Sequence, residues 1–404
     1  MKSAIDNRWE DQVRFLKTLV QMPSDNPPGD CDLHAQKTAE LIEAFGLSVE
    51  RHPVPEPFVL QNGMKSITNL IVRKNFGSGS GPVIALNAHG DVVPPGDGWN
   101  EDPYGGEERN GTIFGRGAAV SKSDFATYVF ALLALGEDTG NLNGSVEIHL
   151  TYDEETGGVV GPKWLLAQGL SKPDLAVSAG FSHSVTTSHN GCLHLEVVAR
   201  GRQAHAAVPE TGHDALEAAT RILSALYLEK QRLSELNSVQ DGIGSPKITV
   251  GLISGGINTN VVPDRVTLRL DRRLIPEEDG NAVEDALIAL IEEAAAASSG
   301  VEVECRRIML AEPLRPLPGI EKIVQSLKTH ARAVLGEDLA ATGSPLYTDA
   351  RHYAEAGIPT VLYGAGPRSI IDANAHSTDE HLELSDLWAA TEIVALMLRD
   401  LLSK

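Results

Sequence analysis

The sequence predicts an α/β protein in which a mainly parallel-sheet domain is interrupted by an inserted α+β domain. Its 404 residues exceed one ordinary hydrophobic core and fit about two domains. Up to about residue 190, and again from about 311, apolar strands alternate with helices, which is typical of a mainly parallel sheet. The segment between them is richer in strands and contains only two helices. We therefore expect one domain at 1–190 and 311–404, and a second at 191–310.

Local patterns place the elements of the first segment. Residues 5–21 form an amphipathic helical pattern, and Gly46 is expected to end a helix at 34–45 as its C-cap. The run GPVIALNAHGDVV at 81–93 is rich in Val and Ile and predicts a strand buried on both faces. The other elements expected here are strands at 48–54, 68–74, 145–155 and 173–180, and helices at 121–136 and 161–169.

The inserted segment begins with CLHLEVVARG at 192–201, an alternating pattern that predicts a strand with one exposed face. Further strands at 247–256, 264–275 and 301–309 and helices at 213–228 and 281–298 would give a four-stranded antiparallel sheet backed by two helices. The α/β pattern then returns with a helix at 319–335, a strand at 358–366 and a final helix at 384–402.

Composition excludes several classes of protein. A net charge of −21 without a basic cluster would repel a phosphate backbone, so we expect no nucleic-acid partner. No apolar run approaches the roughly 20 residues that cross a bilayer, so we expect no membrane span. The three cysteines (Cys31, Cys192 and Cys305) are odd in number and lack metal-type spacing, which favours reduced, packed thiols in a cytoplasmic protein.

Polar residues follow two of the buried strands. His89 and Asp91 end the first of these strands, at the edge of a parallel sheet where ligands collect. Residues two apart on a strand share a face, so Asp91 can orient the His89 ring as it would that of a metal ligand. The acids Asp153, Glu154 and Glu155 end the second strand, where a cation would offset their repulsion and one carboxylate could act as a base. A structural hydrogen bond and a solvated acidic loop are the alternatives.

Several further segments together resemble the metallo-amidohydrolases that include acetylornithine deacetylase, succinyl-diaminopimelate desuccinylase, aminoacylase and carboxypeptidase G. The matches occur in the family's order and cover nearly the whole chain. They are NAHGDVVP (87–94), GRGAAVSK (115–122), YDEETGG (152–158), GRQAHAAVPETGHDA (201–215), NTNVVPDRV (258–266), DRRLIP (271–276), TDAR (348–351), GIPTVLYGAGP (357–367) and AHSTDE (375–380).

The resemblance implies a catalytic α/β domain that holds two zinc-type ions and an inserted lid domain that usually dimerises. By position, His89 resembles a ligand of one metal, and Asp91 resembles the partner that orients it. Glu154 resembles the general base, which accepts a proton from the attacking water and passes it to the leaving nitrogen. Glu155 and His376 resemble ligands of the other metal.

The inserted domain and one glycine-rich turn are assigned by the same resemblance. His205 resembles the lid histidine that stabilises the oxyanion, in dimeric relatives from the partner subunit. Asn260 and Arg273 match lid positions that line the substrate site. The turn containing Gly364 and Gly366 would offer backbone amides to a substrate carboxylate.

Two positions depart from the family's pattern. In relatives the position of Val120 is an aspartate that bridges both metals, and the position of Gly180 is an acid that completes the first site. One explanation is a single metal on His89, Glu155 and His376 with an open position. A second is that Asp124 or His183 replaces the lost ligands. A third is a protein that binds a ligand without catalysis.

We expect a metal-dependent hydrolase of a C–N bond, most simply the amide of a small N-acyl amino acid or dipeptide-like compound. The expected cofactor is Zn²⁺ or Mn²⁺, one ion per chain rather than two. The expected partners are a small-molecule substrate and a second copy of the chain in a homodimer. Hydrolysis of a non-peptide C–N bond, such as removal of an amine from an aromatic ring, is the alternative reaction.

Overall fold

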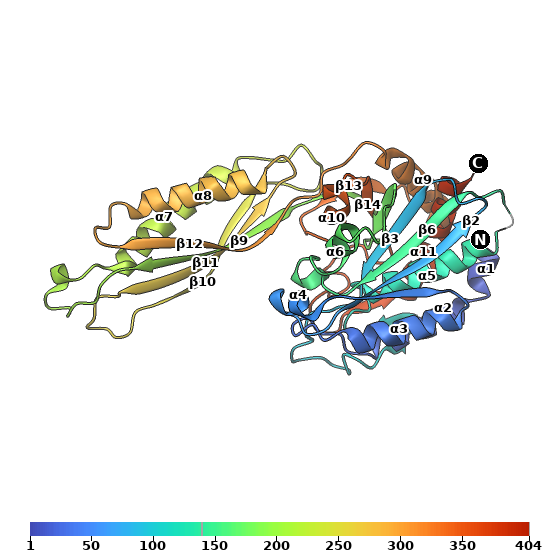
Figure 1. Cartoon of the computed structure of the whole chain (residues 1–404), viewed down its shortest axis with the longest axis horizontal. Helices are drawn as coiled ribbons and strands as arrows, with labels where there is room; N and C mark the ends of the chain where they lie inside the picture. Colours follow the sequence, from blue (N-terminus) through green and yellow to red (C-terminus); the bar gives the residue numbers. More distant parts are fainter. Residues whose placement is uncertain (139, 404) are drawn as a thin grey trace. The chain divides into compact units, whose positions relative to one another are not determined.

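The computed structural model describes residues 1–138 and 140–403 and divides into two compact units (Figure 1). The α/β domain comprises Met1–Thr187, Pro316–Thr342 and Thr348–Lys404. The inserted domain comprises Ser188–Arg315 together with the short segment Gly343–Tyr347. The sequence contains no signal for this last segment, because its five residues, which include the end of β13 (Ala340–Ser344), are too few to show a periodicity of their own.

In the described part of the chain, the α/β domain contains an eight-stranded sheet with the order β1-β2-β6-β3-β7-β14-β8-β13. Its central strands β6, β3, β7 and β14 are parallel, whereas β1, β2 and β8 pair antiparallel with their neighbours. The predicted α/β fold with a mainly parallel sheet is confirmed. The strands are β1 (Val49–Pro53), β2 (Thr68–Phe76), β3 (Val83–His89), β6 (Gly144–Thr151), β7 (Leu175–Ser178), β8 (Ser184–His189), β13 (Ala340–Ser344) and β14 (Thr360–Leu362).

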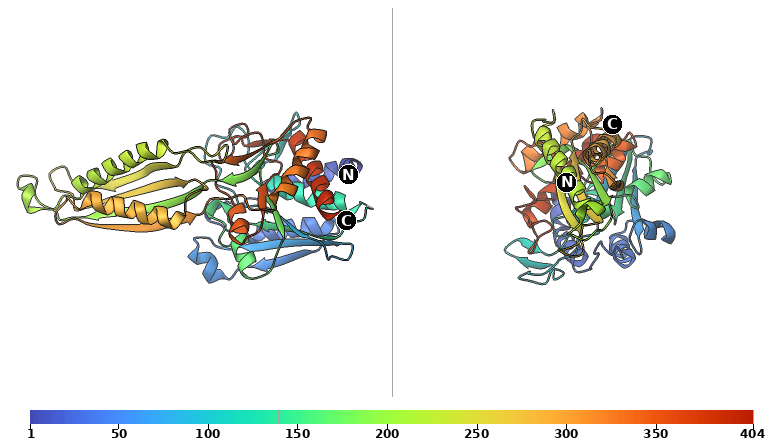
Figure 2. Two further views of the ribbon diagram at one scale, coloured as in Figure 1. Left: turned by 90° about the horizontal axis from the view of Figure 1, so that it is seen from above. Right: turned by 90° about the vertical axis from the view of Figure 1, so that its left-hand side faces the viewer.

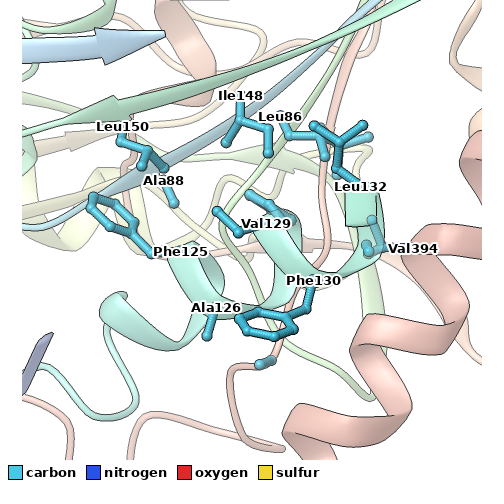
Figure 3. Packing of buried hydrophobic residues seen from close by; sticks show 14 of the residues in the cluster. Leu86, Ala88, Phe125, Ala126, Val129, Phe130, Leu132, Ile148, Leu150 and Val394 are labelled. Carbon is cyan, nitrogen blue, oxygen red and sulfur yellow. The ribbon is translucent and has the colours of Figure 1, made fainter. Parts of the chain in front are cut away.

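Helices pack against this sheet through alternating residues of its buried strands. On β3, Leu86 and Ala88 belong to the large core cluster that includes Phe125 and Val129 of α5, as Figure 3 shows. Ala85, one residue away and on the other face, packs instead with Tyr353 of α10. The helices are α1 (Lys2–Asp6), α2 (Trp9–Val20), α3 (Asp32–Ala44), α4 (Glu56–Gln61), α5 (Lys122–Gly136), α6 (Pro162–Ala167), α9 (Ile320–Val334), α10 (Ala350–Glu355) and α11 (Leu384–Leu402).

The inserted domain is a four-stranded antiparallel sheet of order β10-β11-β9-β12 with α7 and α8 on one face (Figure 1, Figure 2). Leu193, Leu195 and Val197 alternate along β9 and point into its own core beneath the helices. This matches the predicted α+β arrangement. The elements are β9 (Gly191–Arg200), α7 (Ala215–Ser234), β10 (Lys247–Gly255), β11 (Arg265–Leu274), α8 (Gly280–Ala295) and β12 (Glu302–Ala311).

Some elements differ from the sequence-based expectation. The helix expected at 5–21 is two helices, because the chain turns between α1 and α2. The strand expected to continue into the acids ends at Thr151, and Glu154–Thr156 form a single 3₁₀ turn. Short elements such as α4, α10 and β8 were not predicted, since fewer than two turns or a few residues leave little periodicity. A small sheet of β4 (Glu107–Arg109), β5 (Thr112–Phe114) and β15 (His381–Glu383) was also missed.

Candidate metal centre

Parallel pairing of two strands brings the first two polar motifs together. His89 is the last residue of β3, and its register partner on β6 is Thr151, the last residue of that strand. The amide of Gly90 donates a hydrogen bond to the Thr151 carbonyl at 2.8 Å, which holds the two loops side by side as they leave the sheet. The carboxyl ends of adjacent parallel strands therefore position the histidine and the acids at one edge.

Four of the predicted residues meet at this edge. His89, Glu154 and Glu155 each offer a ligand atom, and these atoms all lie within 4.8 Å of one another. The His89 Nε2 atom is 3.9 Å from Glu154 Oε2. From a distant loop, His376 Nε2 lies 3.1 Å from Glu155 Oε1. Two imidazoles and two carboxylates from three segments of the chain thus form one cluster.

Asp91 holds the residues of the cluster in position through contacts of its side chain and its carbonyl. Its carboxylate is fully buried and lies 3.3 Å from His89 Nδ1, which also contacts the Asp91 carbonyl at 2.9 Å. The same carboxylate accepts hydrogen bonds from the amides of Glu154 (3.3 Å) and Glu155 (3.2 Å). Because Nδ1 is engaged in this way, Nε2 is the His89 nitrogen that faces the acids and is available to a metal.

One contributor to the site has no sequence signal. Asn26, in the loop after α2, is buried, and its Nδ2 donates a hydrogen bond to Asp91 Oδ2 at 2.9 Å. An asparagine in the proline-rich segment SDNPPG resembles any turn residue. Its role depends on a contact across 65 positions of sequence, which periodicity and local motifs do not indicate.

The pKa shifts in the cluster reflect burial and the close spacing of its acidic and imidazole groups. Burial raises the pKa of Glu154 to about 7, with Glu155 and Asp91 adding to the effect and His89 opposing it. Burial alone would lower the pKa of His89, but Asp91 and Glu154 raise it overall. The Glu155 carboxylate also raises the pKa of His376. A divalent cation would offset this excess of negative charge, and imidazole with carboxylate is a donor set that suits Zn²⁺ or Mn²⁺.

The loop that carries His376 has an unusual backbone. Asn374, His376 and Asp379 all adopt left-handed φ values, of 50°, 58° and 57°. Residues other than glycine adopt this region rarely, so the surrounding contacts must stabilise it. Asp379 accepts hydrogen bonds from the amide (3.0 Å) and the side chain (2.6 Å) of Asn100, which anchors the loop.

The segment containing Val120 is attached to both histidine segments. Glu380 is fully buried, and its Oε2 accepts a hydrogen bond from Arg116 at 2.6 Å. Its Oε1 accepts the amides of Ala119 and Val120, each at 3.1 Å. The next residue, Ser121, donates its hydroxyl to the His89 carbonyl at 3.1 Å. Val120 therefore lies in the backbone framework of the cluster, yet its side chain has no donor atom for a metal.

The two residues considered as replacement ligands are engaged elsewhere. Asp124 Oδ1 accepts a hydrogen bond from the Ala365 amide at 2.7 Å, and burial raises the pKa of this carboxyl to about 7. His183 uses both ring nitrogens, with Nδ1 3.2 Å from Glu337 and Nε2 3.1 Å from Asp386. Neither side chain belongs to the cluster, so the suggestion that one of them restores the lost ligands is not supported.

The turn at Gly364 and Gly366 makes hydrogen bonds within the protein. The Gly366 amide donates to the Gly180 carbonyl at 2.9 Å, and the Ala365 amide is bound to Asp124. These two amides are thus bound in the protein itself, and the role of the turn in holding a substrate carboxylate stays a prediction. A Cβ atom at Gly364 would lie 2.0 Å from Asp124 Oδ1, so close approach of this carboxylate explains the glycine.

The remaining predicted residues belong to the inserted domain. His205 is exposed, and its Nδ1 accepts a hydrogen bond from the Ala207 amide at 3.0 Å, which leaves the proton of the neutral ring on Nε2. Asn260 lies beside it, since its carbonyl accepts the Ala206 amide at 3.0 Å. Arg273 is on β11, where its Nε donates to Asp271 Oδ1 at 3.0 Å.

The sequence is similar to a known protein family and to curated relatives. Residues 85–400 match the Peptidase family M20/M25/M40, a span that includes all four residues of the cluster. The chain belongs to the M20/M25/M40 peptidase family. It is 28% identical to a succinyl-diaminopimelate desuccinylase of Gluconacetobacter diazotrophicus over the full length of both chains. A second desuccinylase, from Thioalkalivibrio sulfidiphilus, is 28% identical and covers 84% of this chain and 88% of its own.

Solved structures of the M20 family share the fold. An M20 family metallo-carboxypeptidase from Sulfolobus solfataricus superposes with a TM-score of 0.77 at 19% identity, over 96% of this chain and 98% of its own. A dinuclear metal-binding M20 peptidase from Bacillus subtilis gives 0.68 at 18% identity, over 98% and 99%. As a member of this M20 family, the protein is a metal-dependent hydrolase. None of the helices in the described residues has the length and apolarity of a membrane span.

Proposed function

We propose that the protein hydrolyses the amide bond of a small N-acyl amino acid or dipeptide-like substrate at a single divalent ion. The observation that carries the proposal is the cluster of His89, Glu154, Glu155 and His376 at the end of β3 and β6. Relatives named as succinyl-diaminopimelate desuccinylases support an N-acyl substrate, because they are similar over the whole chain.

His89, Glu155 and His376 are the residues that would hold the ion. When bound, Zn²⁺ or Mn²⁺ would supply Lewis acidity to the scissile carbonyl and lower the pKa of water. We propose one ion because Val120 and Gly180 bring no side-chain donor to the site. Asp124 and His183 are not proposed as replacement ligands, since both side chains are bound elsewhere.

Glu154 is the proposed general base. Its carboxylate is adjacent to the ligands and lies 3.9 Å from His89 Nε2, where it can accept a proton from the attacking water and deliver it to the leaving nitrogen. His205, protonated at Nε2, is the proposed donor to the oxyanion, and Asn260 and Arg273 are the proposed substrate contacts.

Substitution Glu154→Gln tests the mechanism. The amide side chain keeps the shape of the residue but has no basic oxygen, so turnover should fall by about 10²–10⁴-fold. Release of free amine from N-succinyl and N-acetyl amino acids and from dipeptides would be followed by mass spectrometry. Elemental analysis of the same sample should show unchanged metal content, whereas Glu155→Gln should lose one ion per chain.

Glu56→Gln is the matched control, because Glu56 is an exposed glutamate at the start of α4 and the substitution makes the same chemical change. It should leave both turnover and metal content unchanged. Wild-type turnover by Glu154→Gln would contradict the role of the base. Loss of metal from that variant would instead make Glu154 a ligand.

We further propose that the inserted domain forms a homodimer through β10 and α7. β10 is at the edge of its sheet and exposes Leu252 (60%) and Ile253 (56%). The neighbouring helix α7 exposes Leu216 and Leu228, and Leu216 and Ile253 line one shared hollow. An exposed apolar edge strand is a template for pairing with a second copy.

The three unbridged cysteines support a further proposal, that the protein is located in the cytoplasm.

A further inference from the structure

A second group of potential metal ligands lies in the inserted domain. Cys192 and His194 are two residues apart on β9, and Asp271 on β11 is the register partner of His194. All three side chains therefore point to one face of the sheet, opposite to the neighbours Leu193 and Leu195, which enter the core beneath α7 and α8. Nothing in the proposed hydrolytic mechanism uses Cys192, His194 or Asp271.

The three donor atoms converge. Cys192 Sγ is 3.2 Å from His194 Nε2, and His194 Nε2 is 2.9 Å from Asp271 Oδ2. The triangle closes with 3.5 Å between Sγ and Oδ2. Ligands at ordinary Zn–S, Zn–N and Zn–O bond lengths in a tetrahedral site are about 3.3–3.6 Å apart. An expansion of a few tenths of an ångström would therefore admit an ion at the centre.

A nucleophilic triad does not fit the same geometry. In such a triad the imidazole uses one nitrogen for the thiol and the other for the carboxylate that orients it. Here His194 turns the same nitrogen, Nε2, to both Cys192 and Asp271. Three donors that face one point indicate a shared central cation rather than a relay through the ring.

Charge and access also suit a divalent ion. A thiolate and a carboxylate with a neutral imidazole carry two negative charges, which match a divalent cation. Arg273 Nε donates to the other oxygen, Asp271 Oδ1, at 3.0 Å and so holds the carboxylate in orientation. Cys192 is fully buried, but the side chains of His194 and Asp271 are 36% and 28% exposed and leave a route for the ion.

We propose that Cys192, His194 and Asp271 form a second metal site, selective for a thiophilic divalent ion such as Zn²⁺. Three protein ligands leave one position open to water or to a small anionic ligand. The thiolate favours Zn²⁺ over Mn²⁺ or Mg²⁺, so this site and the cluster of imidazoles and carboxylates should differ in metal preference.

Cobalt substitution tests the proposal without relying on activity. Addition of excess Co²⁺ to the metal-stripped full-length protein should produce a thiolate-to-cobalt charge-transfer band in the near ultraviolet, and its final intensity should correspond to one thiolate-bound ion per chain. The cluster on the α/β domain contains no sulfur, so it cannot contribute this band. Substitution Cys192→Ser should abolish the band and lower the total Zn²⁺ content by one ion per chain.

Two further variants make the result decisive. Cys305→Ser, the matched control on β12 of the same sheet, should retain the band and the metal content. His194→Gln keeps the thiol and changes a partly exposed side chain, and it should weaken Co²⁺ binding at least tenfold. Absence of the band from the wild type, or its persistence in Cys192→Ser, would overturn the proposal, as would wild-type Co²⁺ affinity in His194→Gln.

Discussion

At the scale of single residues, Val120 and Gly180 are the basis of the proposal that the candidate centre holds one ion. Val120 is tied to the site through its amide, which donates to Glu380, and through Ser121, which binds the His89 carbonyl. Gly180 is packed too tightly for a larger residue, because a Cβ there would lie 2.9 Å from Leu362 Cβ and from the Tyr363 amide nitrogen. Only the first position is therefore open to restoration of a donor.

Val120→Asp should increase the metal content of the α/β domain. The new carboxylate would be placed beside the cluster by the same backbone contacts, and an added ion would offset its charge. Elemental analysis would be performed in the Cys192→Ser background, so that an ion in the inserted domain does not enter the count. Val120→Asn, which adds a polar group of the same size without charge, is the control. Equal metal content in both variants would contradict the expectation.

At the scale of elements, the loops around the centre are held by one buried ion pair. Arg116 follows β5 and Glu380 precedes β15, and these two strands pair in the small sheet. Glu380 also satisfies two amides of the segment that contains Val120. The pair thus connects the loop that carries His376 to the segment that contacts His89.

Glu380→Gln should destabilise the protein by about 3–5 kcal/mol, because Arg116 would remain buried without a compensating charge. Urea unfolding followed by circular dichroism would measure the loss. Glu137→Gln removes the acid of an exposed pair with Arg8, and its cost should stay below about 1 kcal/mol. Similar unfolding midpoints for the two variants would show that the buried pair does not stabilise the loops.

At the scale of the whole molecule, each domain has its own hydrophobic core, and the inserted domain leaves apolar side chains exposed on β10 and α7. A net charge of −21 opposes association of two copies at long range. Burial of apolar surface at the edge of β10 would have to outweigh this repulsion, which added salt would screen.

Ile253→Asp should dissociate the proposed dimer, because the new carboxylate would be buried without a partner at the interface. Light scattering at micromolar concentration should give twice 43.1 kDa for the wild type and 43.1 kDa for the variant. Ile308→Asp, on the opposite edge strand β12, is the control and should stay dimeric. A monomeric wild type would contradict the proposal.

Much of the candidate site was predictable because its residues occupy recognisable local positions. His89 and Glu154 follow buried strands, and parallel strands must present their carboxyl ends at one edge. Asn26 and the competing partners of Asp124 and His183 were not predictable, because their contacts join segments distant in sequence. Cys192 and His194 do carry a weak signal, since alternate residues of a strand share a face, but Asp271 completes their group only through pairing of β9 with β11.

The sequence by itself determined the fold class, the family and the identity of the residues available for chemistry, because periodicity, motif order and side-chain type are local properties. Only the tertiary structure decided which of those side chains meet. It placed His376 against Glu155, bound Asp124 to the Ala365 amide, and directed Cys192, His194 and Asp271 to one point. These contacts depend on strand register and loop packing. Both bring together residues that are distant in sequence, so local patterns do not specify them.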